Sequence, residues 1–186
     1  MLLNGSPLRE YGPEVPLRNY NMGYTTEFSG QFNLDKPLTK AHREYLHKFN
    51  RTRRMHRNAI CESMADPARE AVKLPIGKQG EFFVGGLGFA GQDRDDSIVE
   101  YNSPPATQPG LWCQWIPNED GTAIVWDGGE KFYEYIPWIE YLIENFLRPW
   151  GYVLNGTVNW EGEGSDDTGK IRIKNNEVTA QMDSGW

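Results

Sequence analysis

The sequence predicts a single α+β domain of the ferredoxin-like, split βαβ type, with an antiparallel sheet and two helices on one face of it. Three observations support this prediction. Several segments alternate apolar and polar residues, as strands with one solvated face do. Two segments repeat apolar residues at the 3.6-residue period of a helix. The predicted order along the chain is β-α-β-β-α-β-β, and 186 residues suit one domain with one core.

The first half of the chain begins with an extended N-terminal arm at residues 1–24, which is rich in Gly, Pro and Asn. The domain proper is predicted at residues 25–182. Its first strand starts at Thr26 and carries Phe28 and Phe32 on one face. A helix with an apolar stripe follows from Asp35 and ends in a basic run. An irregular, loop-rich insertion then occupies residues 58–110, and we expect a short helix at 66–72 and a short strand at 81–84 within it.

The second half contains two hairpins and the strongest helical pattern. The hairpins are predicted from the paired runs 111–116 with 122–127 and 152–161 with 170–178, each interrupted by turn-type residues. The helix between them follows the apolar stripe from Phe132 to Phe146, and Pro137 predicts a kink or a false start near Tyr133. These periodicities predict one shared core: Phe28, Phe32, Leu46, Phe49, Val125, Phe132, Ile139, Leu142, Phe146, Val158 and Ile171.

The composition of the chain indicates in which compartment, and with which classes of partner, the protein is expected to act. The formal net charge of −7 argues against general attraction to nucleic acid or to anionic membranes, so nucleic acid is a possible partner but not the favoured one. Two cysteines form no disulfide framework, and the start of the chain lacks the pattern of a signal peptide. No apolar stretch approaches the roughly 20 residues that a membrane span needs. We therefore expect a cytoplasmic protein in a reducing compartment, without membrane partners.

The sheet face opposite the helices is the first candidate binding surface. Alternation predicts that amide and basic side chains gather there, and several small-ligand and RNA-binding proteins of this topology use such a face. The candidate binding residues on it are Gln31, Asn155, Asn159 and Arg172, which Trp112 and Gln114 could join. Two alternatives stay open, namely a plain solvated face and a face covered by the 58–110 insertion.

The basic run at the end of the first helix is the second candidate site. Arg51, Arg53, Arg54 and Arg57 form the main concentration of positive charge in an acidic chain. Arginine suits forked contacts with phosphate or carboxylate, so with Trp112 the run could bind an anionic partner through freely projecting side chains. The alternative is compensation of the helix dipole together with ion pairs to the chain's own acids.

Other motifs predict no catalytic, metal or cofactor site. The segment from Gly86 to Gly91 matches G-x-G-x-x-G but is followed by acids and no helical stripe, so we interpret it as a glycine-rich loop. Asp127 and Glu130 precede the second helix and are interpreted as its cap. The histidines and cysteines lack the companions that a zinc site or a catalytic thiol would need.

Segments 101–115 and 126–133, with their sequences QPGLWCQW and WDGGEKFY, resemble small uncharacterised proteins of actinobacterial tailed phages and of actinobacteria. Segments 154–163 and 167–171 resemble the same family's C-terminal hairpin, and the likeness covers roughly residues 27 to 178. The resemblance implies no activity and no functional residues. It implies a context, that of a phage accessory protein that acts in the bacterial host cytoplasm or assembles with itself.

Taken together, these observations predict a non-enzymatic binding protein. Its partner would be a host protein, as for an anti-defence factor, or an anionic, phosphate-bearing small molecule. The alternatives are a small enzyme acting on a nucleotide-like or phosphorylated substrate and a structural virion component. The N-terminal arm is predicted to mediate docking or homo-oligomer formation.

Overall fold

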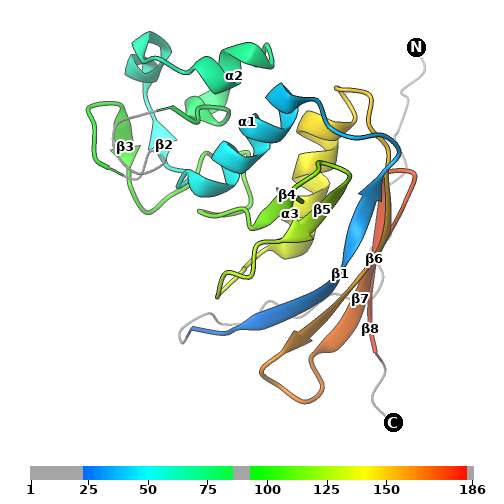
Figure 1. Ribbon diagram of the computed structural model, residues 1–186. Helices are drawn as coiled ribbons and strands as arrows, with labels where there is room; N and C mark the ends of the chain where they lie inside the picture. Colours follow the sequence, from blue (N-terminus) through cyan, green and yellow to red (C-terminus); the bar gives the residue numbers. More distant parts are fainter. Residues whose placement is uncertain (1–22, 86–92, 184–186) are drawn as a thin grey trace, which may run out of the picture.

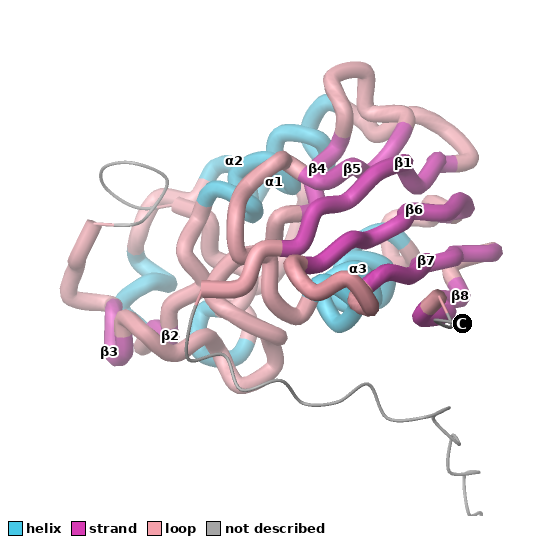
Figure 2. Tube along the Cα trace, turned by 90° about the horizontal axis from the view of Figure 1, so that it is seen from below, coloured by secondary structure: helices cyan, strands magenta, loops and turns pink. Residues whose placement is uncertain are grey.

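A computed structural model gives the structure of residues 23–85 and 93–183. The predicted arm, apart from Gly23 and Tyr24, and the glycine motif at 86–91 lie outside the described residues. The described chain is mixed α+β and is built on a six-stranded antiparallel sheet in the order β4-β5-β1-β6-β7-β8. In Figure 2, β1, β6, β7 and β8 follow one another from top to bottom. The strands are β1 (Thr26–Leu34), β4 (Trp115–Pro117), β5 (Ala123–Trp126), β6 (Leu154–Gly162), β7 (Thr168–Lys174) and β8 (Glu177–Met182).

The helices lie together on one side of this sheet (Figure 1). They are α1 (Lys40–Arg51), α2 (Pro67–Ala71) and α3 (Tyr135–Leu142), with α3 continued by a π-helical turn, η3 (Ile143–Leu147). The insertion also holds two short 3-10 helices, η1 (Ala59–Ser63) and η2 (Lys78–Gly80), and a two-stranded sheet of β2 (His56–Arg57) with β3 (Ile98–Glu100). The coarse prediction of an α+β domain with an antiparallel sheet is therefore confirmed.

The first helix begins later than the sequence pattern suggested. Thr39 is its N-cap, and its hydroxyl accepts a hydrogen bond from the backbone N–H of His42 at 3.2 Å. The helix ends at Arg51, and the extended residue Thr52 follows. Arg53, Arg54 and Arg57 consequently lie beyond the helix, so they do not compensate its dipole from within the last turn.

The second long helix shows the expected false start. Pro137 is the third residue of α3, where its missing N–H would have no partner within the helix in any case. Glu134, just before the helix, has a left-handed conformation with φ of 55°, which separates Phe132 from the regular turns. Phe132 is nevertheless buried. Asp127 does not cap this helix, because its carboxylate accepts bonds from Gly129 N–H at 2.7 Å and from the Asn50 amide at 3.0 Å.

Two strand predictions are wrong. Residues 170–178 are not one strand, because Asn175 and Asn176 have φ of 50° and 67° and form a two-residue turn between β7 and β8. The predicted strand at 81–84 is a turn, in which the N–H of Phe83 donates to the carbonyl of Gly80 at 3.0 Å. The first error hid the sixth strand of the sheet, because both asparagines stand inside an otherwise alternating pattern.

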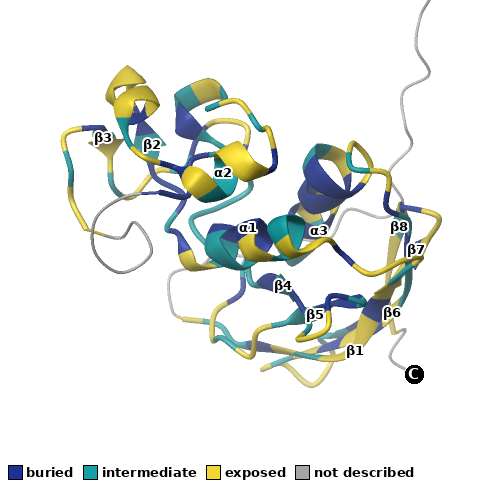
Figure 3. Ribbon diagram, turned by 45° about the horizontal axis from the view of Figure 1, so that its top comes forward, coloured by how far each residue is buried: buried dark blue, intermediate teal, exposed yellow. Residues whose placement is uncertain are grey.

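The core lies between the helices and the inner face of the sheet (Figure 3). Of the predicted core residues, those in the buried cluster are Phe32, Leu46, Phe49, Phe132, Ile139, Leu142, Phe146, Val158 and Ile171. Phe28 packs against the cluster while partly exposed. Val125 is the exception, because it lies outside the cluster and is only partly buried, next in the chain to the fully buried Ile124.

Close pairing of β1 with β6 depends on two glycines. A Cβ at Gly30, where φ is 105°, would lie 2.7 Å from the carbonyl oxygen of Thr157. A Cβ at Gly156, where φ is 144°, would lie 2.6 Å from the carbonyl oxygen of Gln31. Any larger residue would therefore push the two central strands apart.

Candidate binding surfaces

The register of β1, β6 and β7 places the predicted polar residues side by side on one face of the sheet. Gln31 lies opposite Thr157, which lies opposite Arg172. Asn159 lies between Ser29 and Lys170 in the next row of this face. The side chains of Gln31, Asn159 and Arg172 are exposed, and the described part of the insertion lies on the helix side, so it does not cover them (Figure 1).

Charge on this open face is balanced rather than positive. Lys170 forms an ion pair with Asp183 at 3.4 Å, and Glu27 lies opposite Glu161 at one end of the face. Asn155 is occupied locally, because its side-chain oxygen accepts the N–H of Asn175 at 2.8 Å and so supports the β7–β8 turn. Arg172 forms no ion pair within the described residues. The candidate residues thus share one surface, without a pronounced anion-binding field.

Trp112 and Gln114 do not belong to the open face. Gln114 precedes β4, at the edge of the sheet, and its side-chain N–H donates to the carbonyl of Glu130 at 3.0 Å. Its side-chain oxygen accepts the indole N–H of Trp126 at 3.2 Å. Trp112 lies instead beside Arg53. The strand containing both was expected from residue 111, but regular pairing begins only at Trp115.

Arg54 is buried, contrary to the expectation that the whole run projects freely. Its side chain is 2% exposed and its guanidinium lies 4.2 Å from the centre of the Phe49 ring. Nη2 donates to the carbonyls of Glu81 at 2.6 Å and of Phe83 at 3.0 Å. Burial lowers the pKa of Arg54 from its usual value. This arginine therefore fastens the insertion onto α1 and is not available to an external partner.

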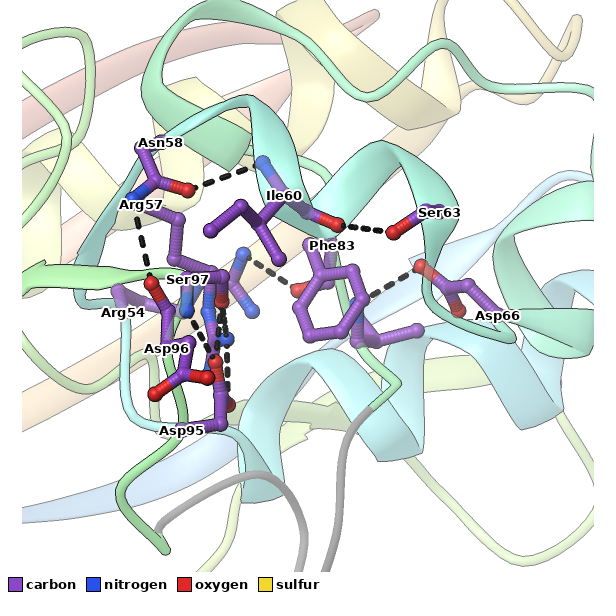
Figure 4. A network of polar contacts seen from close by, with 11 residues as sticks. Arg54, Arg57, Asn58, Ile60, Ser63, Asp66, Phe83, Asp95, Asp96 and Ser97 are labelled. Carbon is purple, nitrogen blue, oxygen red and sulfur yellow. Dashed lines mark hydrogen bonds and ion pairs between the residues drawn. The ribbon is translucent and has the colours of Figure 1, made fainter.

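Arg57 is also buried, at 3% exposure, in the polar network shown in Figure 4. Its Nη1 lies 2.9 Å from the Asp95 carboxylate and 2.5 Å from the Ser97 hydroxyl. The other Asp95 oxygen accepts the Ser97 N–H at 2.8 Å and also the Ser97 hydroxyl. Burial by itself raises the pKa of Asp95, but the hydrogen bonds from Ser97 and Arg57 outweigh it and leave that pKa below its usual value. Arg57 therefore joins β2 to the segment before β3.

Arg53 and Arg94 lie beside two aromatic side chains in a surface that we call the Arg53 cluster: Arg53, Arg94, Tyr101 and Trp112, with Arg51 two residues before Arg53 in the chain. The Arg53 guanidinium lies 4.4 Å from the centre of the Tyr101 ring and 5.9 Å from that of Trp112. The Arg94 guanidinium lies 5.4 Å from the Tyr101 ring centre. Arg51, at the end of α1, is exposed. Within the described residues none of these three arginines forms an ion pair with a carboxylate.

Arg53 is held in a fixed orientation by neutral partners. Its Nε donates to the carbonyl of Tyr101 at 3.0 Å, and Nη2 donates to the side-chain oxygen of Asn102 at 2.9 Å. The other terminal nitrogen, Nη1, has no protein acceptor among the described residues, so this side of the guanidinium can face a ligand. Aromatic stacking and two fixed hydrogen bonds reduce the entropy that the side chain would lose on binding.

Sequence reasoning missed two members of this cluster. Tyr101 lies in the loop-rich insertion, and nothing in its spacing links it to Arg53, 48 residues earlier. Arg94 stands among acids at Asp93 and Asp95, which hid its contribution. An isolated base within an acidic run was the only local signal.

Both cysteines are poor candidates for reactive groups. Burial raises the pKa of Cys113 to about 12 and also raises that of Cys61, so both remain protonated thiols at neutral pH. In the described part of the chain, no three or more His, Cys, Asp or Glu side chains are grouped so that they could hold a metal ion. Within residues 23–85 and 93–183, every helix is too short or too polar to span a lipid bilayer.

The chain was also compared with known proteins. Protein-family models, curated proteins and solved structures gave no match in any of the three comparisons.

Proposed function

We propose that the protein is a non-enzymatic binding protein that holds an anionic partner at the Arg53 cluster. The observation that supports this most directly is the Arg53 guanidinium, stacked on Tyr101 at 4.4 Å and oriented by two neutral hydrogen bonds. A guanidinium oriented in this way suits a phosphate or carboxylate, because Arg53 forms no ion pair with a carboxylate of the described residues that such a ligand would have to displace. Arg51 and Arg94 would add to the attraction.

The positive surface extends from the cluster along α1. Arg43, His47 and Arg51 follow one another at four-residue spacing, so they lie on one face of the helix. Burial lowers the pKa of His47, and the nearby Arg51 and Arg43 lower it further, so His47 is neutral at pH 7 and the two arginines supply the positive charge of this face. A partner with several negative groups, such as an acidic protein surface or a polyphosphate, could follow this face.

The wider identity of the protein is part of the same proposal. We propose a phage accessory factor directed at a host protein or at a phosphate-bearing host ligand, which acts in the bacterial cytoplasm. The two cysteines are buried free thiols, in keeping with a reducing compartment. We also propose that the fold is ferredoxin-like, with β1, β4, β5 and β6 as the basic unit. The order β4-β5-β1-β6, with α1 after β1 and α3 after β5, supports this assignment.

Loss of the Arg53 guanidinium is expected to weaken binding about tenfold or more, because a charged hydrogen bond contributes about 1.5–3 kcal/mol. The tagged full chain would first be used to recover proteins and small metabolites from an expressing bacterial host, with mass spectrometry of both. Calorimetry would then compare the wild type with Arg53→Ala and Arg53→Lys, using the recovered partner or, for phosphate ligands, ATP and inorganic phosphate. Lysine should restore binding only in part, because an ammonium cannot form the fork.

Arg172→Ala is the matched control, because it removes an exposed arginine from the open sheet face. If binding falls with Arg172→Ala and is kept with Arg53→Ala, the partner uses the sheet face and the Arg53 cluster is not the site. Conversion of a recovered phosphorylated metabolite into a new product would favour the enzymatic alternative, and incorporation into purified particles would favour the structural virion component.

A further inference from the structure

The two edges of the main sheet differ in how they are protected. β4, at one edge, has only three residues and includes Pro117, and a short strand with proline is a poor template for further pairing. β8, at the other edge, has six residues without proline or a bulge. Five of its six residues are exposed. Natural sheets rarely leave such an edge open, so β8 requires an explanation.

The backbone groups of β8 alternate in direction. Lys174 and Glu177 flank the two-residue turn and form one hydrogen-bonded pair between β7 and β8. Thr168 and Asp183 form another, because the N–H of Asp183 donates to the carbonyl of Thr168 at 2.8 Å. Odd-numbered residues of β8 therefore bond to β7. The N–H and C=O groups of Val178, Ala180 and Met182 point to the free edge, where they have no backbone partner in the described part of the chain.

The same three residues carry the apolar side chains of the strand. Val178 packs partly against the core, Ala180 is exposed, and Met182 is 38% exposed. Their neighbours Glu177, Thr179 and Gln181 lie on the polar face. The residues whose backbone groups are unpaired at the free edge are therefore the same residues whose side chains are apolar.

We propose that β8 pairs antiparallel with β8 of a second copy of this chain, centred on Ala180. In that register Ala180 lies opposite the partner's Ala180, and Val178 lies opposite the partner's Met182. The free N–H and C=O groups of all three residues then face those of the second copy. Apolar side chains lie opposite apolar side chains on the same face of the extended sheet. A shift by one residue would place apolar against polar side chains, so the strand specifies its own register.

Charge is compatible with this arrangement. The ends of the paired strands bring Glu177 near the partner's Asp183. Each acid already has a base of its own chain, since Arg148 lies 3.7 Å from Glu177 and Lys170 lies 3.4 Å from Asp183. These bases offset the repulsion, and the centre of the interface contains no charge.

A second copy fits the edge better than the chain's own N-terminal arm does. Residues 1–22 include Pro7, Pro13 and Pro16, each of which lacks the N–H that a continuous ladder needs. β8 has no proline and offers a matching partner in every other copy of the protein. The pairing is independent of the Arg53 cluster and of the partner proposed for it.

The test is the mass of the full chain by light scattering from about 1 µM to about 1 mM, a range suited to a small interface. The wild type should pass from monomer to dimer. Ala180→Pro removes the central N–H, which points away from β7, so it should keep the fold and raise the dimer dissociation constant about tenfold or more. Ala180→Lys should also weaken the dimer, because it places like charges directly opposite each other.

Thr179→Lys is the control, because it adds the same charge on the polar face and should leave the dimer intact. A wild type that stays monomeric throughout overturns the proposal, as does a dimer that survives both substitutions at position 180. Equal loss of the dimer in Ala180→Lys and Thr179→Lys would also contradict it, because net charge would then be the cause. If deletion of residues 1–22 abolishes the dimer while Ala180→Lys keeps it, the arm is the interface instead.

Discussion

Replacement of Phe146 by Ala is expected to lower the free energy of unfolding by about 3–5 kcal/mol. Phe146 is fully buried in η3 and lies where the two long helices and the insertion meet. Its ring centre lies 5.1 Å from that of Phe49 and 5.4 Å from that of Tyr45, both in α1, and 5.8 Å from that of Phe82 in the insertion. Truncation would leave a cavity bounded by these rings, which cannot collapse without moving all of them.

Reversible chemical denaturation would measure this effect. Ile60→Ala is a suitable control, because Ile60 is 49% exposed and its truncation should change stability by less than about 0.5 kcal/mol. A loss below about 1 kcal/mol for Phe146→Ala would contradict its placement at the centre of the core.

Replacement of Asp95 by Ala is expected to cost about 3 kcal/mol, because it removes the carboxylate that lies 2.9 Å from the buried Arg57 guanidinium. The Asp95 side chain is 12% exposed, which places the expected loss at the lower end of the range for a broken buried pair. The substitution also removes the acceptor of two Ser97 hydrogen bonds. Asp96→Ala is the matched control, because Asp96 is exposed and accepts the Asn58 side-chain N–H through its backbone carbonyl, which the substitution keeps.

The same carboxylate predicts a dependence on pH. The folded state lowers the pKa of Asp95 below its usual value, so its contribution is complete above the unfolded-state pKa, near 3.9, and is lost as the pH falls through the folded-state value. The stability difference between wild type and Asp95→Asn should therefore be large at pH 7 and should shrink below about pH 4. Denaturation at a series of pH values would measure it, and a difference independent of pH would rule out the ionised pair.

Local periodicity in the sequence was sufficient to predict those strands and helices that bury one face. The alternation from Thr26 predicted β1, and the apolar stripes predicted α1 and α3, because a half-buried strand or helix repeats its core contacts at a fixed interval. Pro137 and the residues before it correctly predicted an irregular start of α3. The register of β1, β6 and β7 then placed Gln31, Asn159 and Arg172 on one exposed face, as alternation had predicted.

Elements that depend on turns or on distant contacts were missed. The Asn175–Asn176 turn divides an alternating run into β7 and β8, since both asparagines adopt left-handed φ values without interrupting the pattern. β2 and β3 pair across about 40 residues of chain, and no repeat within either strand signals that pairing.

The arginine run separates most clearly what the sequence determined from what tertiary structure decided. The sequence by itself determined that Arg51, Arg53, Arg54 and Arg57 bring positive charge to the end of α1. Only the packing of the insertion decided that Arg54 and Arg57 are buried while Arg51 and Arg53 remain at the surface. The physical reason is that burying a guanidinium is costly unless acceptors meet most of its N–H groups. Those acceptors, the carbonyls of Glu81 and Phe83 and the carboxylate of Asp95, come from residues 27 to 38 positions further along the chain.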